Sequence, residues 1–157
     1  MKIIQSDFIA LNAKIAILTT HVNNFINENL LRNSIDTLIR IGKIKKDNIT
    51  IIKVPGSQEL PLITNIIVKS KKYDAIIVLG SIIKGKTMHF ELLATSVTNE
   101  ISNISIQNNI PITLGLITAE NVIQAIDRSG TKYGNKGHDA ALACLELINI
   151  INKINKL

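Results

Sequence analysis

The amino-acid sequence predicts a three-layer α/β/α fold, in which helices cover both faces of a four-stranded parallel sheet with flavodoxin-like strand order. Short aliphatic runs alternate with longer segments whose apolar residues recur at helical spacing, and two further helical segments follow the last aliphatic run. Parallel strands need long crossover connections, so this alternation favours a parallel sheet over hairpins. The length of 157 residues suits one core, and no linker or internal repeat divides the chain. We therefore expect a single domain over residues 1–157.

Four strands and five helices are expected, taken here in chain order. The strands are nearly continuous aliphatic runs, which are typical of strands buried on both faces of a sheet. They lie over 14–20 (KIAILTT), 49–54 (ITIIKV), 75–79 (AIIVL) and 112–117 (ITLGLI). Apolar residues at helical spacing predict helices over 24–40, 58–69, 89–107, 120–128 and 138–151. Gly42 is expected to end the first helix in the usual manner of a C-terminal glycine, and GTKYGNKG separates the last two helices.

Composition and charge exclude several classes of protein. Hydrophobic residues make up 46% and charged residues 19% of the chain, which excludes a disordered protein. The net charge of +6 would suit a nucleic-acid partner, but the lysines are scattered and only 3% of residues are aromatic, so platforms for stacking bases are nearly absent. We therefore expect a solvated basic surface and no nucleic-acid partner.

Cysteine usage and hydropathy indicate the compartment. Cys144 is the single cysteine, so there is neither a disulfide framework nor a zinc motif, and a reducing compartment fits best. Asp7 interrupts the apolar start of the chain, which is unlike a signal peptide. No apolar run approaches the roughly 18 residues needed to span a bilayer. These features predict a cytoplasmic protein without a membrane partner.

The expected sheet indicates where the chemistry lies. In open α/β sheets, ligands bind beyond the carboxyl ends of the strands. The four loops that follow the predicted strands share this edge, and they hold His21, Glu59, Lys84, Lys86, Thr87 and His89. The candidate polar residues are therefore expected to gather at one end of the molecule.

One of these loops matches the phosphate-binding P-loop pattern of many ATPases, since residues 80–87 read GSIIKGKT. The match is weak, because Ile82 and Ile83 are stiff β-branched residues where a P-loop needs small ones, and no predicted strand ends in an aspartate that could hold Mg²⁺. Gly85, Lys86 and Thr87 still precede a helix, so they suit a single phosphate group. The alternative is a helix entry with Thr87 as its N-cap.

Four blocks of sequence carry a resemblance to a known family. They are VPGSQELP (54–61), LGSIIKGKTMHFE (79–91), GLITAENVIQAIDRSGTKYGNKG (115–137) and AALACLEL (140–147). In order and spacing they resemble lumazine synthase, over about 13–147 of the chain. The most specific parts are the Thr-x-His-Phe segment and the run from Asp127 to Gly137.

The resemblance implies an activity and roles for particular residues. Lumazine synthases join 5-amino-6-(D-ribitylamino)uracil to 3,4-dihydroxy-2-butanone 4-phosphate, release phosphate and water, and use neither a metal nor a redox cofactor. It implies that His89 transfers protons, which suits an imidazole at neutral pH. It also implies phosphate binding by Gly85, Lys86, Thr87, Arg128 and Lys136, and binding of the ribitylaminouracil by Val22, Ser57, Gln58, Glu59, Ser81, Ile82, Ile83 and Leu114.

Three of the residues named through the resemblance also have a simpler, structural explanation. His89 and Glu59 would otherwise serve the starts of their helices, and Arg128 would be a cation at a helix C-terminus. The sequence also departs from the family, because many members have aromatic residues where this chain has Val22, Gln58 and Leu114. An alternative reading is therefore a non-catalytic shell-forming or flavin-binding homologue with a degraded pocket.

The resemblance also implies an assembly. Lumazine synthases form pentamers in which each site lies between neighbours, with the Leu114 and Arg128 side from one chain and the His89 loop from another. Many bacterial members join pentamers into an icosahedral shell, and riboflavin synthase is a candidate partner. The segment KIIQSDF (2–8) is expected to add an edge strand to a neighbouring subunit.

Overall fold

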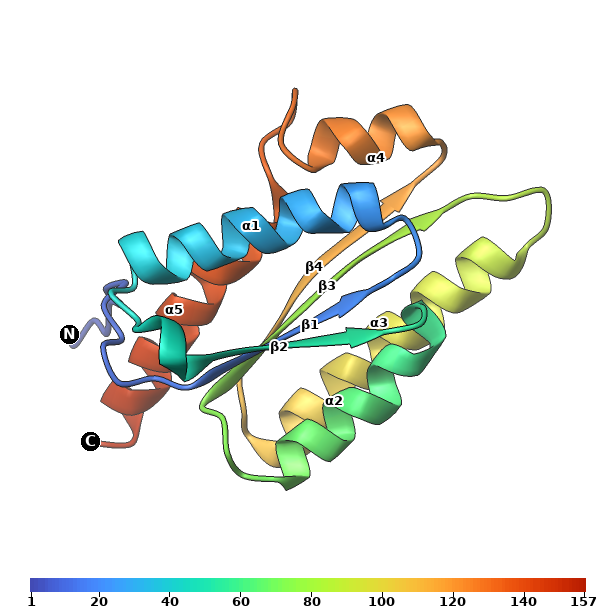
Figure 1. The fold of residues 1–157 in the computed structure, drawn as a ribbon. Coiled ribbons are helices and arrows are strands. Elements are labelled where there is room, and N and C mark those ends of the chain that lie inside the picture. The colour runs from blue at the N-terminus through green and yellow to red at the C-terminus, as the bar shows by residue number, and fades with distance from the viewer.

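The computed structural model describes residues 1–157, and its centre is a four-stranded parallel sheet in the order β2-β1-β3-β4 (Figure 1). The strands are β1 Ile15–Thr20, β2 Ile49–Val54, β3 Ala75–Ile83 and β4 Ile112–Ala119. The helices are α1 Asn24–Arg40, α2 Leu60–Lys69, α3 His89–Asn108, α4 Val122–Arg128 and α5 Lys136–Ile154, with short 3-10 turns η1 Lys46–Asn48 and η2 Ser57–Glu59. The predicted fold class and flavodoxin-like order are confirmed.

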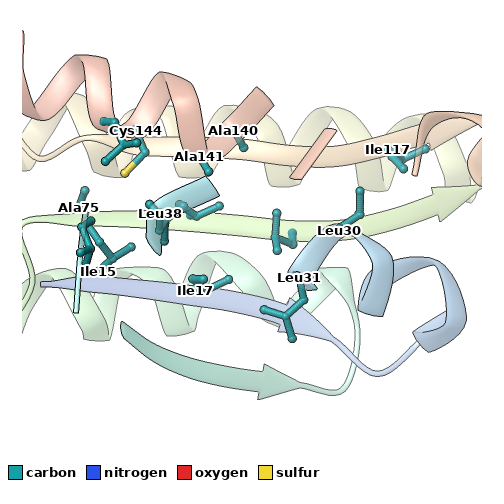
Figure 2. Packing of buried hydrophobic residues seen from close by; sticks show 14 of the residues in the cluster. Ile15, Ile17, Leu30, Leu31, Leu38, Ala75, Ile117, Ala140, Ala141 and Cys144 are labelled. Carbon is teal, nitrogen blue, oxygen red and sulfur yellow. The ribbon is translucent and has the colours of Figure 1, made fainter. Parts of the chain in front are cut away.

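Two hydrophobic layers fill the space between the sheet and its helices. The strand alternation divides β1, because Ile15 and Ile17 point to the layer under α1 and α5, while Ala16 and Leu18 point to the layer under α2 and α3. Figure 2 shows the first layer, in which the sheet side chains meet Leu30 and Leu38 of α1, Ala141 of α5 and their neighbours. Burying a leucine or isoleucine completely stabilises the fold by roughly 1.5–3 kcal/mol, so the pairing of each helix with the sheet is well determined.

The expectation that all four strands are buried on both faces is wrong for the two outer ones. In β1 every residue is buried, and in β3 all but Ile83 are. In β2 only Val54 is buried, and β4 alternates between buried and half-exposed residues over most of its length. The reason is their place in the sheet: β2 and β4 are edge strands, which the helices cover only in part. An aliphatic run alone does not distinguish a central strand from an edge strand.

Gly42 does not close α1 as expected, and its role is close packing. The left-handed residue after α1 is Lys43, at φ 57°, rather than Gly42. A Cβ at Gly42 would lie 2.6 Å from the Leu38 carbonyl oxygen and 2.7 Å from a methyl of Leu145. Gly137 serves the same purpose at the start of α5, where a Cβ would overlap the backbone of Leu30. These two glycines allow α5 to lie against α1.

The remaining segments add little regular structure. Residues 1–12 form neither helix nor strand, and they lie beside the end of α5, where the Lys153 Nζ donates a 2.6 Å hydrogen bond to the Gln5 carbonyl. The outer edge of β2 has no strand beside it. None of the five helices combines the length and apolar character that a membrane span requires.

Cys144 gives the fold a testable pH dependence. It is completely buried in α5, and this burial raises the pKa of its thiol from 9.0 to about 12. The folded protein therefore holds the thiol proton more tightly than the unfolded chain. The resulting stabilisation is complete below pH 9 and is lost as the pH rises towards 12, by up to about 1.4 kcal/mol per pH unit.

We expect the difference in unfolding free energy between the wild type and Cys144→Ala to be constant below pH 9 and to shrink above it. Urea unfolding at pH 7, 8.5 and 10 measures this difference, and lysines and tyrosines cancel because both proteins contain them. A difference that is unchanged at pH 10 would show that the thiol is not shielded in the folded state.

Candidate active site

A hollow of about 380 Å³ lies at the carboxyl end of the sheet, and its volume is within the range of small-molecule sites. The loop after β1, the η2 turn, the end of β3 and the start of α3 form its walls. We call it the His89 hollow. Its lining residues are Val22, Asn23, Gly56, Ser57, Gln58, Ser81, Ile82, Ile83, Gly85, Thr87, His89, Phe90 and Leu93. Nine of these thirteen were singled out from the sequence, so the edge of the sheet expected to bind a ligand does contain a cavity.

The end of β3 forms the floor of this hollow and excludes the P-loop interpretation. Gly80–Ile83 are extended strand residues paired with β4, from Gly80 opposite Leu116 to Ile83 opposite Ala119, whereas a P-loop curves around phosphate. On the other side, the pairing of β3 with β1 stops at Leu79. Beyond Leu79, β3 therefore has one edge without a strand partner. Apart from the Ser81 carbonyl, which accepts a hydrogen bond from Asn23 Nδ2, the backbone amide and carbonyl groups on that edge are free to bind the edge of a heterocycle.

His89 is the first residue of α3, and its side chain is exposed at the rim of the hollow. The imidazole has no hydrogen-bond partner within the chain, so both ring nitrogens are free for a ligand. The N-cap of α3 is Met88, which makes no side-chain cap, while Thr87 Oγ1 accepts a 3.4 Å hydrogen bond from the His89 amide. The first turn of α3 therefore keeps unsatisfied amides next to Gly85 and Lys86, which favours a negatively charged group there.

The loop that carries His89 is tied to β4 by Lys84. The Lys84 amide donates to the Ala119 carbonyl at 2.9 Å, and the Lys84 Nζ lies 3.3 Å from Glu120 and 3.8 Å from Glu91. These ion pairs are exposed, so each contributes less than about 1 kcal/mol. Together with the backbone bond to Ala119, they hold the first residue of the 84–88 loop next to β4 and to the first turn of α3.

Glu59 has the simpler of its two expected roles, which is to serve the start of its helix. Its Oε2 accepts a 2.9 Å hydrogen bond from the Gly56 amide, which caps the start of η2. The side chain does not line the His89 hollow, unlike its neighbours Ser57 and Gln58. The Oε1 atom has no partner in the chain, so one carboxylate oxygen remains available to a ligand that extends past η2.

Arg128 and Lys136 line a second hollow, which we call the Arg128 hollow and which Gln124, Asp127 and Tyr133 complete. Arg128 is the last residue of α4, is exposed, and forms no ion pair within the chain. The link to α5 is closed by Asn135, whose amide donates 2.7 Å to the Ser129 carbonyl while its oxygen accepts from the amides of Gly137 and His138. The hydrogen bonds of Asn135 therefore hold the ends of α4 and α5 that carry Arg128 and Lys136, and these two residues line a different hollow from His89.

One chain does not bring all the predicted residues together. Arg128 and Lys136 do not line the His89 hollow, and Leu114 lines neither hollow. Leu114 lies in the middle of β4, half-buried, and packs against the layer under α2 and α3. Lys86 is exposed beside the His89 hollow without lining it. Most of the predicted residues thus form two separate groups on the surface of one chain, and Leu114 belongs to neither.

Several lining residues were missed in the sequence. Phe90 and Leu93 stand one turn apart at the start of α3, and the helical spacing after His89 identifies them as sharing one face. Asn23 is at φ 58°, a left-handed conformation that asparagine tolerates, and its Nδ2 donates a 3.3 Å bond to the Ser81 carbonyl. No sequence pattern indicates that contact, because it joins residues 58 positions apart.

A larger hollow at the other end of the sheet does not compete with the His89 hollow. Its volume is about 500 Å³, and residues just before the strands, among them Ala13, Asp74 and Pro111, line it. It therefore lies at the amino ends of the strands, where open α/β sheets do not usually bind ligands. No group of three His, Cys, Asp or Glu residues is arranged to hold a metal ion.

Comparisons with known proteins identify the family. The profile of the 6,7-dimethyl-8-ribityllumazine synthase family matches residues 12–152. The chain is 53% identical over its full length to the 6,7-dimethyl-8-ribityllumazine synthase of Buchnera aphidicola subsp. Acyrthosiphon pisum (strain Tuc7), of which it covers 98%. It is 55% identical, over 97% of its length and 96% of the relative's, to the protein of that name from Buchnera aphidicola subsp. Baizongia pistaciae, and 54% identical, over 98% of each chain, to that of Blochmanniella pennsylvanica. The chain belongs to the 6,7-dimethyl-8-ribityllumazine synthase family.

Proposed function

We propose that the protein is a 6,7-dimethyl-8-ribityllumazine synthase, a transferase that acts in the penultimate step of riboflavin biosynthesis. It condenses 5-amino-6-(D-ribitylamino)uracil with 3,4-dihydroxy-2-butanone 4-phosphate and releases phosphate and water. Family membership over residues 12–152 supports the reaction. The observation that carries it to this chain is the unpartnered His89 imidazole at the rim of a hollow with an open strand edge.

The geometry suits the proton transfers of this condensation. When an amine adds to a carbonyl, the nitrogen loses a proton and the oxygen gains one before water leaves, and loss of phosphate needs a proton removed from a neighbouring carbon. His89 supplies and accepts these protons, because an imidazole exchanges protons near neutral pH and this ring has no competing partner. The chain's own groups supply this chemistry, and we propose no cofactor.

The two substrates bind to different groups. The ribitylaminouracil lies in the His89 hollow, with its heterocycle along the edge of residues 81–83 and against Val22, and with its ribityl chain beside Ser57, Gln58 and the free oxygen of Glu59. The phosphate of the second substrate is held by the Arg128 guanidinium with help from Lys136, and on its other side by the loop residues Gly85, Lys86 and Thr87. An arginine suits this role because its planar fork binds two phosphate oxygens at once.

The active site is completed by a neighbouring subunit, in a homo-oligomer that we propose to be a pentamer. The separation of the His89 and Arg128 hollows on one chain supports this, since the two phosphate-binding groups meet only if a second copy brings its Arg128 and Leu114 side to the His89 loop. The helix surfaces also support an oligomer: only Val97, Ile101 and Ile104 of the 20 residues of α3 are buried, while Leu92 and Ile106 are exposed. Such an uncovered helix face favours contact with another chain.

We also propose a wider organisation for the protein. Residues 1–157 form a single domain, pentamers join into an icosahedral shell, and the protein works in the cytoplasm with riboflavin synthase as a candidate partner. The free outer edge of β2 supports the addition of an N-terminal strand from a neighbour, for which residues 2–8 are suited because they pair with no strand in their own chain.

Incubation of the purified protein with both substrates tests the function directly. We expect the absorbance of the lumazine product to rise well above the spontaneous background, with light scattering of the same sample reporting a particle much larger than a single chain. A correctly assembled particle that forms no product would instead support the non-catalytic alternative and contradict the enzyme.

A further inference from the structure

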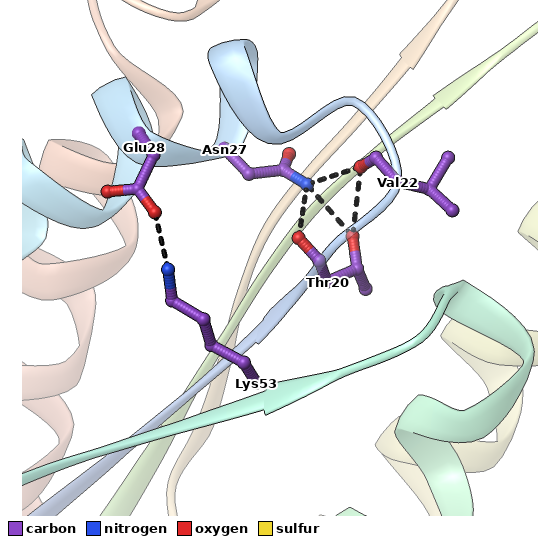
Figure 3. Close-up of polar contacts among 5 residues, drawn as sticks. All are labelled: Thr20, Val22, Asn27, Glu28 and Lys53. Carbon is purple, nitrogen blue, oxygen red and sulfur yellow. Dashed lines mark hydrogen bonds and ion pairs between the residues drawn. The ribbon is translucent and has the colours of Figure 1, made fainter.

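A buried amide that lines neither the His89 hollow nor the Arg128 hollow lies directly behind the first of them. Asn27, in the first turns of α1, is 1% exposed. Its Nδ2 donates to the Thr20 carbonyl at 3.0 Å, to Thr20 Oγ1 at 2.8 Å and to the Val22 carbonyl at 2.8 Å (Figure 3). On its other side, the Asn27 Oδ1 accepts a 3.0 Å hydrogen bond from Ser81 Oγ. The amide therefore joins the β1–α1 loop to β3.

The hydrogen-bond roles fix the orientation of this amide. Thr20 Oγ1 donates to the Val22 carbonyl at 3.4 Å, so it accepts from Asn27. The three oxygens of Thr20 and Val22 need a donor, while Ser81 Oγ needs an acceptor. Only a primary amide provides two N–H donors on one side and a carbonyl on the other at this size. Aspartate lacks the donors, and an aliphatic side chain would leave four buried or half-buried polar atoms without this partner.

Two walls of the His89 hollow depend on these bonds. Val22 and Ser81 both line the hollow, and Asn27 contacts each of them while lining no part of it. Asn23 adds a second link by donating to the Ser81 carbonyl, and the amides of His21 and Val22 bind the carbonyls of Val54 and Pro55 at 2.9 and 3.3 Å. The loop of residues 20–23 is thus held to β3 by two asparagine side chains, of which only Asn27 is buried. The neighbouring Glu28–Lys53 ion pair, at 2.6 Å, joins α1 to β2 but is 40% exposed at both side chains and far less constrained (Figure 3).

We propose that Asn27 is a positioning residue for the pyrimidine substrate, because it sets the distance between Val22 and the strand edge that together receive the heterocycle. The inference rests on the proposed function for the identity of that ligand. Asn27 contacts neither substrate, and the phosphate-binding groups lie elsewhere. Its loss therefore weakens recognition of ribitylaminouracil selectively.

Steady-state kinetics of Asn27→Ala test this selectivity. We expect KM for the ribitylaminouracil to rise about tenfold, because the variant loses binding free energy comparable to that of about one buried hydrogen bond. KM for the butanone phosphate should change by less than about twofold. Thr37→Val is the matched control: Thr37 is completely buried in the same helix, about 15 Å further along its axis, and donates 2.7 Å to the Asn33 carbonyl. It should lower stability and leave both KM values unchanged.

A second variant and a binding measurement keep the outcomes separate. Asn27→Thr retains one donor and should give an intermediate KM, and it decides the matter if Asn27→Ala does not fold. Titration of ribitylaminouracil alone, without the second substrate, reports binding independently of turnover. If Asn27→Ala or Asn27→Thr binds it as tightly as the wild type, or if Thr37→Val weakens it equally, the positioning role is overturned. If the wild type itself neither binds it nor forms product, the proposed function fails first.

Discussion

Replacement of His89 by alanine is expected to lower kcat by on the order of 10²-fold and to leave KM for each substrate within about twofold. The imidazole has no hydrogen-bond partner in the chain and stands exposed at the entry of α3, so its removal breaks no internal hydrogen bond. The loss is therefore a loss of proton transfer rather than of structure. The remaining rate reflects the two substrates held side by side, because proximity and phosphate binding survive.

His138→Asn provides the control for a histidine that has no place in the site. His138 Nδ1 lies 2.7 Å from Thr37 Oγ1, and since that hydroxyl donates to Asn33, the ring nitrogen is the donor. Asparagine keeps a donor near this position, so kcat should stay at the wild-type value. Product formation by His89→Ala at an undiminished rate would assign His89 to the simpler role of starting its helix, and would leave the proton transfers to the substrates and water.

The architecture of the sheet was largely predictable from the sequence, and its limits have a physical cause. β1 and β3 are continuous aliphatic runs because helices cover them on both sides, and this pattern identified them. The runs in β2 and β4 look alike in sequence, yet they lie at edges where part of the apolar surface is left open. Half-exposed Leu114 and Leu116 are therefore informative only once the strand order is known, because only then does β4 prove to be an edge strand.

The site was predictable to the extent that it depends on topology. Parallel strands bring their carboxyl ends together, so Thr87 and His89 were expected at one edge and line one hollow, whereas Val22, Ser57 and Ser81 were named through the family resemblance. The Asn27 network could not be predicted, because its bonds depend on the register of residues up to 54 positions apart. The hydrogen bond that the Gly56 amide donates to Glu59 could not be predicted either, since a capping carboxylate and a ligand-binding carboxylate look the same in the sequence.

Arg128→Ala is expected to raise KM for 3,4-dihydroxy-2-butanone 4-phosphate by roughly 10- to 100-fold, with little change in KM for the ribitylaminouracil. Arg128 is exposed at the end of α4 and is not engaged by any carboxylate of its own chain, so its guanidinium is free for an anion. A hydrogen bond to a charged group contributes about 1.5–3 kcal/mol, which gives the expected range. Arg128→Lys keeps the charge but loses the fork, and should fall between the two.

Arg40→Ala is the matched arginine control, because Arg40 is also exposed at a helix end but is paired with Asp36 at 3.0 Å and lies away from both hollows. It should leave KM for both substrates unchanged. Inorganic phosphate, used as a competitive inhibitor, should lose affinity for Arg128→Ala in parallel with the substrate. If inhibition by phosphate is unaffected, Arg128 serves only its helix terminus, and Lys136 or Lys86 must carry the binding.

The two variants together test whether the site is shared between subunits. The His89 and Arg128 hollows are separate on one chain, so a shared site takes its His89 from one subunit and its Arg128 from the next. Mixed and reassembled His89→Ala and Arg128→Ala chains then contain intact sites at about a quarter of their interfaces, and activity should reappear on mixing. If both groups acted within one chain, every site would carry one of the two substitutions and mixing would restore nothing. Recovery of activity therefore distinguishes a composite site from an intramolecular one without any structure of the assembly.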